Sequence, residues 1–359
     1  MSTGVATTRP MVVRPRWLEA LRQRPVTLAV VGLLAAAIVF LAGIALGNVS
    51  IPLGDTIAIL AHRLGLPVDA TWAASAETIV IDLRLPRVIT AMTVGVALSP
   101  AGVTFQGLLR NPLADPYVLG TASGAALGAA IGFMVPVQVS LLGFGLVHIL
   151  AFTGALLAVA AVYRVSRGGS TGSMTSVLLT GYAVGSLLAA GLAMAMYLSG
   201  SNLRQIFFYL LGSFALASWQ QVVVGLPIIV IGSAVLLSRA QTLNAFLLGE
   251  EAAANLGIDV RRERLILLGT ATLVTAAGVA LSGLIGFVGL VIPHVVRLVV
   301  GPNARLVLPL SAIYGAAFLA LADLVARIPG EIPVGVVTAI IGAPFFLYLL
   351  RHYRVGFEL

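Results

Sequence analysis

The 359-residue chain contains no cysteine and no lysine, and only 9% of its residues are charged. Without cysteine it has no disulfide, no thiolate nucleophile and no Cys-based metal site. Without lysine it has neither a G-x-x-x-x-G-K-[ST] phosphate loop nor a Schiff-base lysine, so any ATP that drives its function must be hydrolysed by another subunit. The four histidines are scattered without ligand spacing. We therefore expect no metal and no other cofactor on this chain, with ATP and Mg²⁺ bound by a partner.

Hydrophobic residues make up 59% of the chain, and the charged share is far below the roughly 25% of soluble domains. This composition is typical of an all-α polytopic membrane protein embedded in a lipid bilayer. Apolar runs close to the ~20 residues that span a bilayer predict about ten transmembrane helices. Their ranges are 26–46, 88–109, 117–135, 139–163, 174–198, 219–238, 265–286, 293–301 (short, and continuing irregularly), 306–326 and 333–350.

The first apolar run follows five arginines and superficially resembles a secretory signal. It extends from Val26 to Leu46, whereas the core of a signal peptide has about 7 to 15 residues. We therefore interpret it as a retained first transmembrane helix.

The distribution of arginine predicts the topology. With the N-terminus in the cytoplasm and ten crossings, sixteen of the 21 arginines fall on the cytoplasmic side, in agreement with the positive-inside rule. Those left outside are Arg63, Arg84, Arg87, Arg204 and Arg327. We expect one transmembrane domain over residues 1–359, with a basic cytoplasmic tail at 1–25 and both termini cytoplasmic. The basic residues are then topology signals, and no nucleic-acid partner is expected.

The most charged segment, residues 241–264, is placed in the cytoplasm by this topology. Apolar residues at helical spacing predict one short amphipathic helix in it, which ends before Gly257. A helix that lies on lipid headgroups would present a basic polar face, whereas this one carries Glu250 and Glu251. A protein partner is therefore favoured over lipid.

Five motifs in order along the chain are similar to those of a known family. They are the segment 84–128, LGEEAAANLG at 248–257, GFVGLVIPHVVRL at 286–298, LADLVAR at 321–327 and IPVGVVTAIIGAPFF at 332–346. From about residue 28 to 352 the chain closely resembles the FecCD-type permeases. These are the membrane subunits of ATP-driven importers for iron-siderophores, haem and vitamin B12.

The resemblance implies a type II ABC importer permease in the cytoplasmic membrane, which is a transport subunit and not an enzyme. It would form a homodimer, or pair with a close paralogue, and bind two cytoplasmic ATPase subunits and an extracytoplasmic substrate-binding protein. Its cargo would cross by alternating access. An iron chelate, either a siderophore complex or haem, is favoured as the commoner cargo of the family, and vitamin B12 is the alternative.

The resemblance also implies roles for individual residues. The ATPase-coupling segment of the family matches Leu248, Gly249, Glu250, Glu251, Ala252, Ala253, Ala254 and Gly257, where three alanines offer a low-relief surface. The arginines that receive acidic residues of the binding protein match Arg84, Arg87 and Arg327. Arginine suits this role because its planar fork binds carboxylates bidentately. The cytoplasmic gate of the path falls at Thr175 and Ser176, in the fifth span.

These assignments have structural alternatives that the sequence leaves open. Arg84 and Arg87 could extend from a helix end to the interface between membrane and water. Arg327 could pair with Asp323, one helical turn earlier. Thr175 and Ser176 could simply cap a helix. The chain also departs from the family pattern at Pro100, inside the second span, and at the short loop 328–332, which affects the expected position of Arg327.

Another class of transporter is a remote alternative. An ion-coupled secondary transporter needs a charged residue near mid-bilayer to bind its ion. Asp323 is the one candidate, and it is expected near the end of a span, beside Arg327. No residue is expected to be catalytic, because the scattered histidines and the missing cysteines provide no nucleophile and base pair.

Overall fold

The computed structural model describes residues 22–47, 49–137, 139–141, 144–167, 174–328 and 330–352. Most of the predicted basic tail, residues 1–21, lies outside the described residues. The elements are α2 (Pro25–Ala45), α3 (Leu53–Arg63), α4 (Ala74–Thr78), the π-helix η1 (Ile79–Arg84), α5 (Leu85–Leu108), α6 (Thr121–Met134), β1 (Ser140–Leu141), β2 (Phe144–Gly145), α7 (Leu146–Arg167), α8 (Met174–Leu198), the 3-10 turn η2 (Gly200–Asn202), α9 (Leu203–Leu211), α10 (Trp219–Ser238), α11 (Ala240–Leu247), α12 (Glu250–Asn255), α13 (Val260–Ser282), α14 (Val288–Val300), α15 (Ala304–Arg327) and α16 (Val334–His352).

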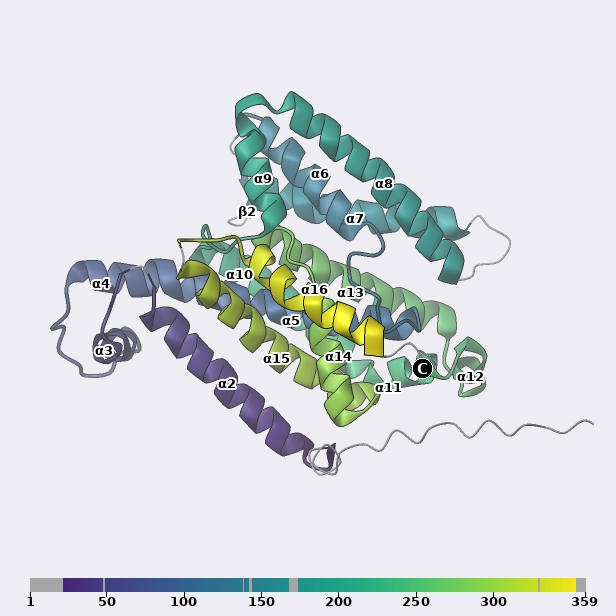
Figure 1. Cartoon of the computed structure of the whole chain (residues 1–359), viewed down its shortest axis with the longest axis horizontal. Helices are drawn as coiled ribbons and strands as arrows, with labels where there is room; N and C mark the ends of the chain where they lie inside the picture. Colours follow the sequence, from purple (N-terminus) through teal and green to yellow (C-terminus); the bar gives the residue numbers. More distant parts are fainter. Residues whose placement is uncertain are drawn as a thin grey trace, which may run out of the picture.

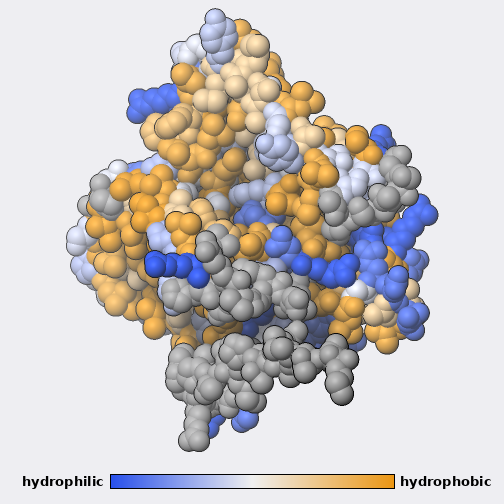
Figure 2. Space-filling model, turned by 45° about the vertical axis from the view of Figure 1, so that its right-hand side comes forward, coloured by the Kyte–Doolittle hydropathy of each residue, from blue (hydrophilic) through white to orange (hydrophobic). Residues whose placement is uncertain are grey.

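The predicted all-α multi-pass architecture is confirmed. Within the described ranges seven helices are long and apolar enough to cross a membrane: α2, the continuous helix from α4 to α5, α7, α8, α10, α13 and α15. Three shorter apolar helices, α6, α14 and α16, occupy the other predicted spans. Hydrophobic side chains cover much of the face shown in Figure 2, as expected for a surface in contact with lipid or other membrane helices.

Several predicted boundaries were wrong for identifiable reasons. The second span begins at Ala74 instead of 88, because α4 and η1 extend α5 without a break. The fourth begins later, since Ser140–Leu141 and Phe144–Gly145 form the antiparallel pair β1 and β2 before α7 starts at Leu146. Hydropathy identifies an apolar stretch but not the hydrogen bonds that decide where its helix begins.

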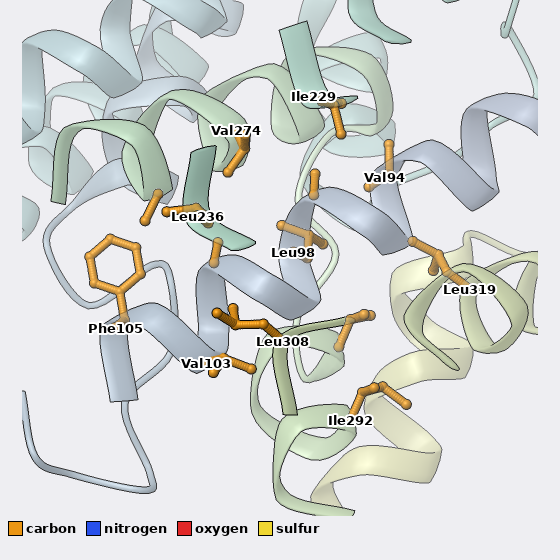
Figure 3. Close-up of a cluster of buried hydrophobic side chains, with 14 of the residues drawn as sticks. Val94, Leu98, Val103, Phe105, Ile229, Leu236, Val274, Ile292, Leu308 and Leu319 are labelled. Carbon is orange, nitrogen blue, oxygen red and sulfur yellow. The ribbon is translucent and has the colours of Figure 1, made fainter. Parts of the chain in front are cut away.

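Helix α5 is the centre of the bundle. In its apolar window 83% of the residues are buried, against α10, α13, α14 and α15. Figure 3 shows Leu98 surrounded by side chains of these helices, including Ile229, Val274 and Leu308. The helix continues through Pro100, although proline donates no backbone hydrogen bond there.

Glycines allow close backbone contacts at several helix pairs of the bundle, including those of the two short helices α6 and α14. A Cβ atom at Gly102 of α5 would overlap the carbonyl group of Gly289, at the start of α14. Helix α6 approaches α7 in the same way, because a Cβ at Gly124 or Gly128 would overlap backbone atoms of α7. Both pairs therefore pack in the small-residue manner common between membrane helices.

The short helices α6 and α14 begin beside each other inside the bundle. Pro116, in the chain segment before α6, lies against Gly289 of α14. The hydroxyl of Tyr117 donates a hydrogen bond to the carbonyl of Ile285 at 3.0 Å. Because the chain reaches the interior before either helix starts, 14 and 13 residues are enough for α6 and α14.

Candidate functional site

The predicted site residues lie at two opposite ends of the bundle. Helix α15 connects these ends, and its 24 residues correspond to about 36 Å. We call the end with the C-terminus of α15, the C-terminus of α2 and the start of α5 the Arg87 end. The other end holds α11, α12 and the start of α15, and we call it the Glu250 end; both can be followed in Figure 1.

At the Arg87 end, the structure brings two of the three predicted docking arginines, Arg87 and Arg327, together around one carboxylate. Asp323 is fully buried, and its Oδ1 accepts hydrogen bonds from Nη2 of Arg87 at 3.0 Å and from Nε at 3.1 Å. Its Oδ2 forms an ion pair with Nη2 of Arg327 at 3.1 Å, one helical turn away. A buried charge is stable only when it is paired in this way. Asp323 therefore fixes the positions of both guanidinium groups.

Arg84 binds backbone oxygens instead of a carboxylate among the described residues. Its Nη1 donates to the carbonyls of Ile44 at 2.9 Å and Ala45 at 2.6 Å, and its Nη2 donates to Val49. Nη1 of Arg327 donates to the carbonyl of Gly43 at 3.0 Å. The last carbonyls of a helix have no partner within it and form the negative end of its dipole. Two of the arginines thus cap the C-terminus of α2.

The three arginines are almost enclosed in this single chain. The exposed fractions are 6% for Arg84, 8% for Arg87 and 3% for Arg327. Their charges are directed mainly to partners within the chain, so Arg84 and Arg87 do not extend to the membrane interface as their structural alternative would have it. The i,i+4 pair of Asp323 and Arg327 is present. Asp323 was the one candidate for binding a coupling ion, and its carboxylate is occupied by this pair.

Sequence reasoning missed Glu331, which lies just before α16. Its Oε2 and Oε1 accept from Nη1 of Arg87 at 2.9 and 3.1 Å, so Arg87 binds two carboxylates at once. The Glu331 side chain is 42% exposed, whereas that of Asp323 is buried. The signal available in the sequence was a lone acidic residue in the loop between the last two spans.

At the Glu250 end, the predicted single amphipathic helix is wrong. The segment forms two helices, α11 and α12, because Gly249 between them has a φ of 114° that other residues rarely adopt. The predicted stop is present, since Gly257 follows α12 with a φ of 80°. The buried Leu243 packs against Gly107 of α5, and the side chain of Asn244 accepts from the backbone N–H of Ala304 at 2.7 Å. Helix α11 is thus anchored to α5 and α15.

The exposed residues of the predicted coupling segment lie within α12 and at both of its ends. Leu248 is 73% exposed and Leu256 is 66% exposed, and Glu251 and Ala254 are exposed as well. Ala253, predicted as part of the low-relief surface, points inward and is fully buried. Two leucines with exposed acidic and small residues between them form a surface that a protein could cover.

Two ion pairs hold this surface in place. Glu250 pairs with Arg264 in the first turns of α13, and Glu263 pairs with Arg239 at 2.7 Å. Glu250 is therefore paired within the chain, whereas Glu251 is exposed and forms none of these pairs. The first pair connects α12 to α13, and the second connects α13 to the junction between α10 and α11. Helix α13 in turn packs against α5 in the centre of the bundle.

The predicted gate residues lie in the first turn of α8, apart from the arginines. Ser176 is half-buried, and the side chain of Thr175 lies outside the described structure. Helix α8 packs on α6 and α7, yet only 6% of its apolar window is buried, the smallest share among the candidate spans of the described chain. Tyr182, Leu187 and Tyr197 are among its exposed side chains. One face of α8 is therefore left for a neighbour outside this chain.

The family model described as the FecCD transport family matches residues 33–352. The chain belongs to the FecCD transport family. The match extends over almost all of the described structure and includes both ends of the bundle.

Curated relatives and a solved structure agree with this family membership. The cobalamin import system permease protein BtuC of Halobacterium salinarum is 43% identical over 328 residues, covering 87% of this chain and 88% of its own length. The hemin transport system permease protein HmuU of Yersinia pestis is 39% identical over 291 residues, covering 80% of this chain and 85% of its own. A structure described as an inward-facing ABC transporter, assigned to the metal-chelate type, matches with a TM-score of 0.74 and 30% identity, covering 94% and 99% of the two chains.

Proposed function

We propose that this chain is the membrane-spanning permease subunit of an ATP-binding-cassette importer, and that it moves a metal chelate into the cell by alternating access. The observation that carries the proposal is the exposed surface of α12 at the Glu250 end, supported by α11 and fixed to α13 by an ion pair. The membership of the chain in a family of transport permeases supports the same function.

The energy comes from outside this chain. A chain without lysine has no phosphate-binding loop of the Walker type, so two separate ATPase subunits bind at the Glu250 end, which faces the cytoplasm. Both termini are then cytoplasmic, as the arginine distribution requires in a cytoplasmic membrane. The exposed Leu248, Glu251, Ala254 and Leu256 form the contact with an ATPase subunit, and the buried Ala253 supports them from behind.

The translocation path forms between two copies of the chain, or between this chain and a close paralogue. The weakly buried face of α8 supports this arrangement, because a second copy would cover it. Thr175 and Ser176, in the first turn of α8, then form the gate on the cytoplasmic side. The neighbouring α9 lies at the outer mouth of the path.

The Arg87 end faces outward and receives the substrate-binding protein. Arg84, Arg87 and Arg327 supply three positive charges there, against the two negative charges of Asp323 and Glu331. Arg84 has no carboxylate partner in this cluster of described residues, and the arginines attract the acidic residues of an approaching partner.

The cargo is an iron chelate, as a siderophore complex or haem, and the cobalamin importer among the relatives makes a corrinoid the second candidate. The deciding experiment places the permease with its ATPase and binding protein in liposomes and measures uptake of labelled iron-siderophore, haem and cobalamin. We expect uptake of one of these chelates that requires both ATP and the binding protein. Uptake driven by an ion gradient without ATP would contradict the proposal.

A further inference from the structure

The two carboxylates on Arg87 differ in their accessibility. Asp323 occupies the Nε and Nη2 edge of the guanidinium group and is completely buried. Glu331 occupies Nη1, and 42% of its side chain is exposed. A competing carboxylate from outside can therefore reach the position of Glu331 but not that of Asp323.

Glu331 is also held less firmly than Asp323. Asp323 forms ion pairs with two arginines and lies within a helix, whereas Glu331 contacts Arg87 alone among the ion pairs of the described residues. The backbone of Glu331 has a φ of 63°, a conformation that is uncommon for a residue other than glycine. Separation of this pair costs little, because the exposed Glu331 carboxylate is solvated when it leaves and Arg87 keeps its ion pair with Asp323.

Exchange of one carboxylate for another preserves the charge balance of this site. Arg87 keeps two negative partners if a carboxylate from another protein replaces Glu331 at Nη1. The planar guanidinium group is already held by Asp323 in a fixed orientation, so the incoming group would meet a preorganised donor.

We propose that Glu331 is a built-in competitor, which occupies Nη1 of Arg87 in the resting permease and is displaced by an acidic side chain of the docking protein. The inference rests on the proposed docking of a substrate-binding protein at the Arg87 end. It explains how a buried arginine can serve as a docking residue: the partner takes over an existing carboxylate position instead of opening a new one. Glu331 thus weakens docking and favours partners that present a carboxylate at this point.

The test measures the affinity of the cognate binding protein for the complete permease and ATPase complex in nanodiscs. Glu331→Gln removes the competing charge with little change of shape, and we expect docking to tighten by about three- to fivefold, with the gain lost at high salt. Asp82→Asn is the matched control, since it removes an exposed negative charge from η1, near Arg84. Equal tightening in both variants would reduce the effect to general electrostatics and overturn the proposal, as would unchanged or weaker docking in Glu331→Gln.

A second measurement separates this proposal from the docking site itself. The chain has no cysteine, so Glu331→Cys introduces a single thiol at the Arg87 end. A heterobifunctional maleimide reagent then tests whether the binding protein crosslinks at this position. Without a crosslink, docking at the Arg87 end fails and the exchange fails with it. A crosslink together with unaltered affinity of the Glu331→Gln complex would overturn the exchange alone.

Discussion

Arg84 donates a hydrogen bond of 2.6 Å to the carbonyl of Ala45, the last residue of α2. The contact joins the first transmembrane helix to the last residue of η1, 39 residues later in the chain. A helix that lies at the edge of the bundle, as α2 does in Figure 1, is thereby fixed at its end by side-chain donors. Its carbonyls would otherwise remain without partners in a region of low water content.

This contact predicts that Arg84→Gln destabilises the protein. The shorter amide cannot reach the carbonyls of Ile44 and Ala45, and the loss of hydrogen bonds from a charged donor costs about 1.5–3 kcal/mol in free energy of unfolding. Thermal unfolding in detergent measures the change. Arg63→Gln, at the exposed end of α3, is the control and should leave the midpoint unchanged.

The buried ion pairs at the Arg87 end predict unequal effects of two isosteric substitutions. Asp323→Asn leaves Arg87 and Arg327 without their shared charge and should lower the free energy of unfolding by about 3–5 kcal/mol. Glu331→Gln removes an acid that is 42% exposed and leaves Arg87 paired with Asp323, so it should cost at most about 1 kcal/mol. Denaturant unfolding of both variants under the same conditions gives the comparison. Equal losses would show that burial does not control the strength of these pairs.

The space around each glycine predicts opposite outcomes for two substitutions, one in the contact between α5 and α14 and one in α13. Gly102→Ala places a methyl group on the carbonyl of Gly289 and should reduce the yield of folded protein. Gly269→Ala, in α13, has no atom within 4 Å of the new methyl group and should be neutral or stabilising by up to about 1 kcal/mol. Size-exclusion profiles and thermal midpoints distinguish the two. A stable Gly102→Ala protein would mean that the two helices can separate without cost.

The exposed leucines beside α12 predict where the ATPase contact is lost. Leu248→Arg or Leu256→Arg should abolish co-purification of the ATPase subunit, because a charged group would enter an apolar contact. The folded permease should remain in the membrane. Leu64→Arg is the matched control, since this leucine is 82% exposed but follows α3, near the other end. Normal ATPase binding in both leucine variants at the Glu250 end would count against the proposed coupling surface.

The sequence was sufficient for the class of fold because hydropathy depends on composition over about 20 residues, and all ten apolar stretches became helices. It was less informative where a single backbone torsion decides the structure. Gly249 divided a predicted helix in two and turned Ala253 inward, since a helical periodicity cannot be extended through a residue with positive φ. Glu331 was missed because its partner Arg87 is 244 residues away, and neither spacing nor composition reports such a contact.

The exposed face of α8 affects how stability must be measured in this protein. A helix whose own chain buries only 6% of its apolar window takes most of its packing from lipid or from a second subunit. By mass action, the population of correctly packed α8 then depends on the concentration of whatever covers it. The apparent unfolding temperature is therefore a property of the assembly, and it should rise with the ratio of protein to detergent.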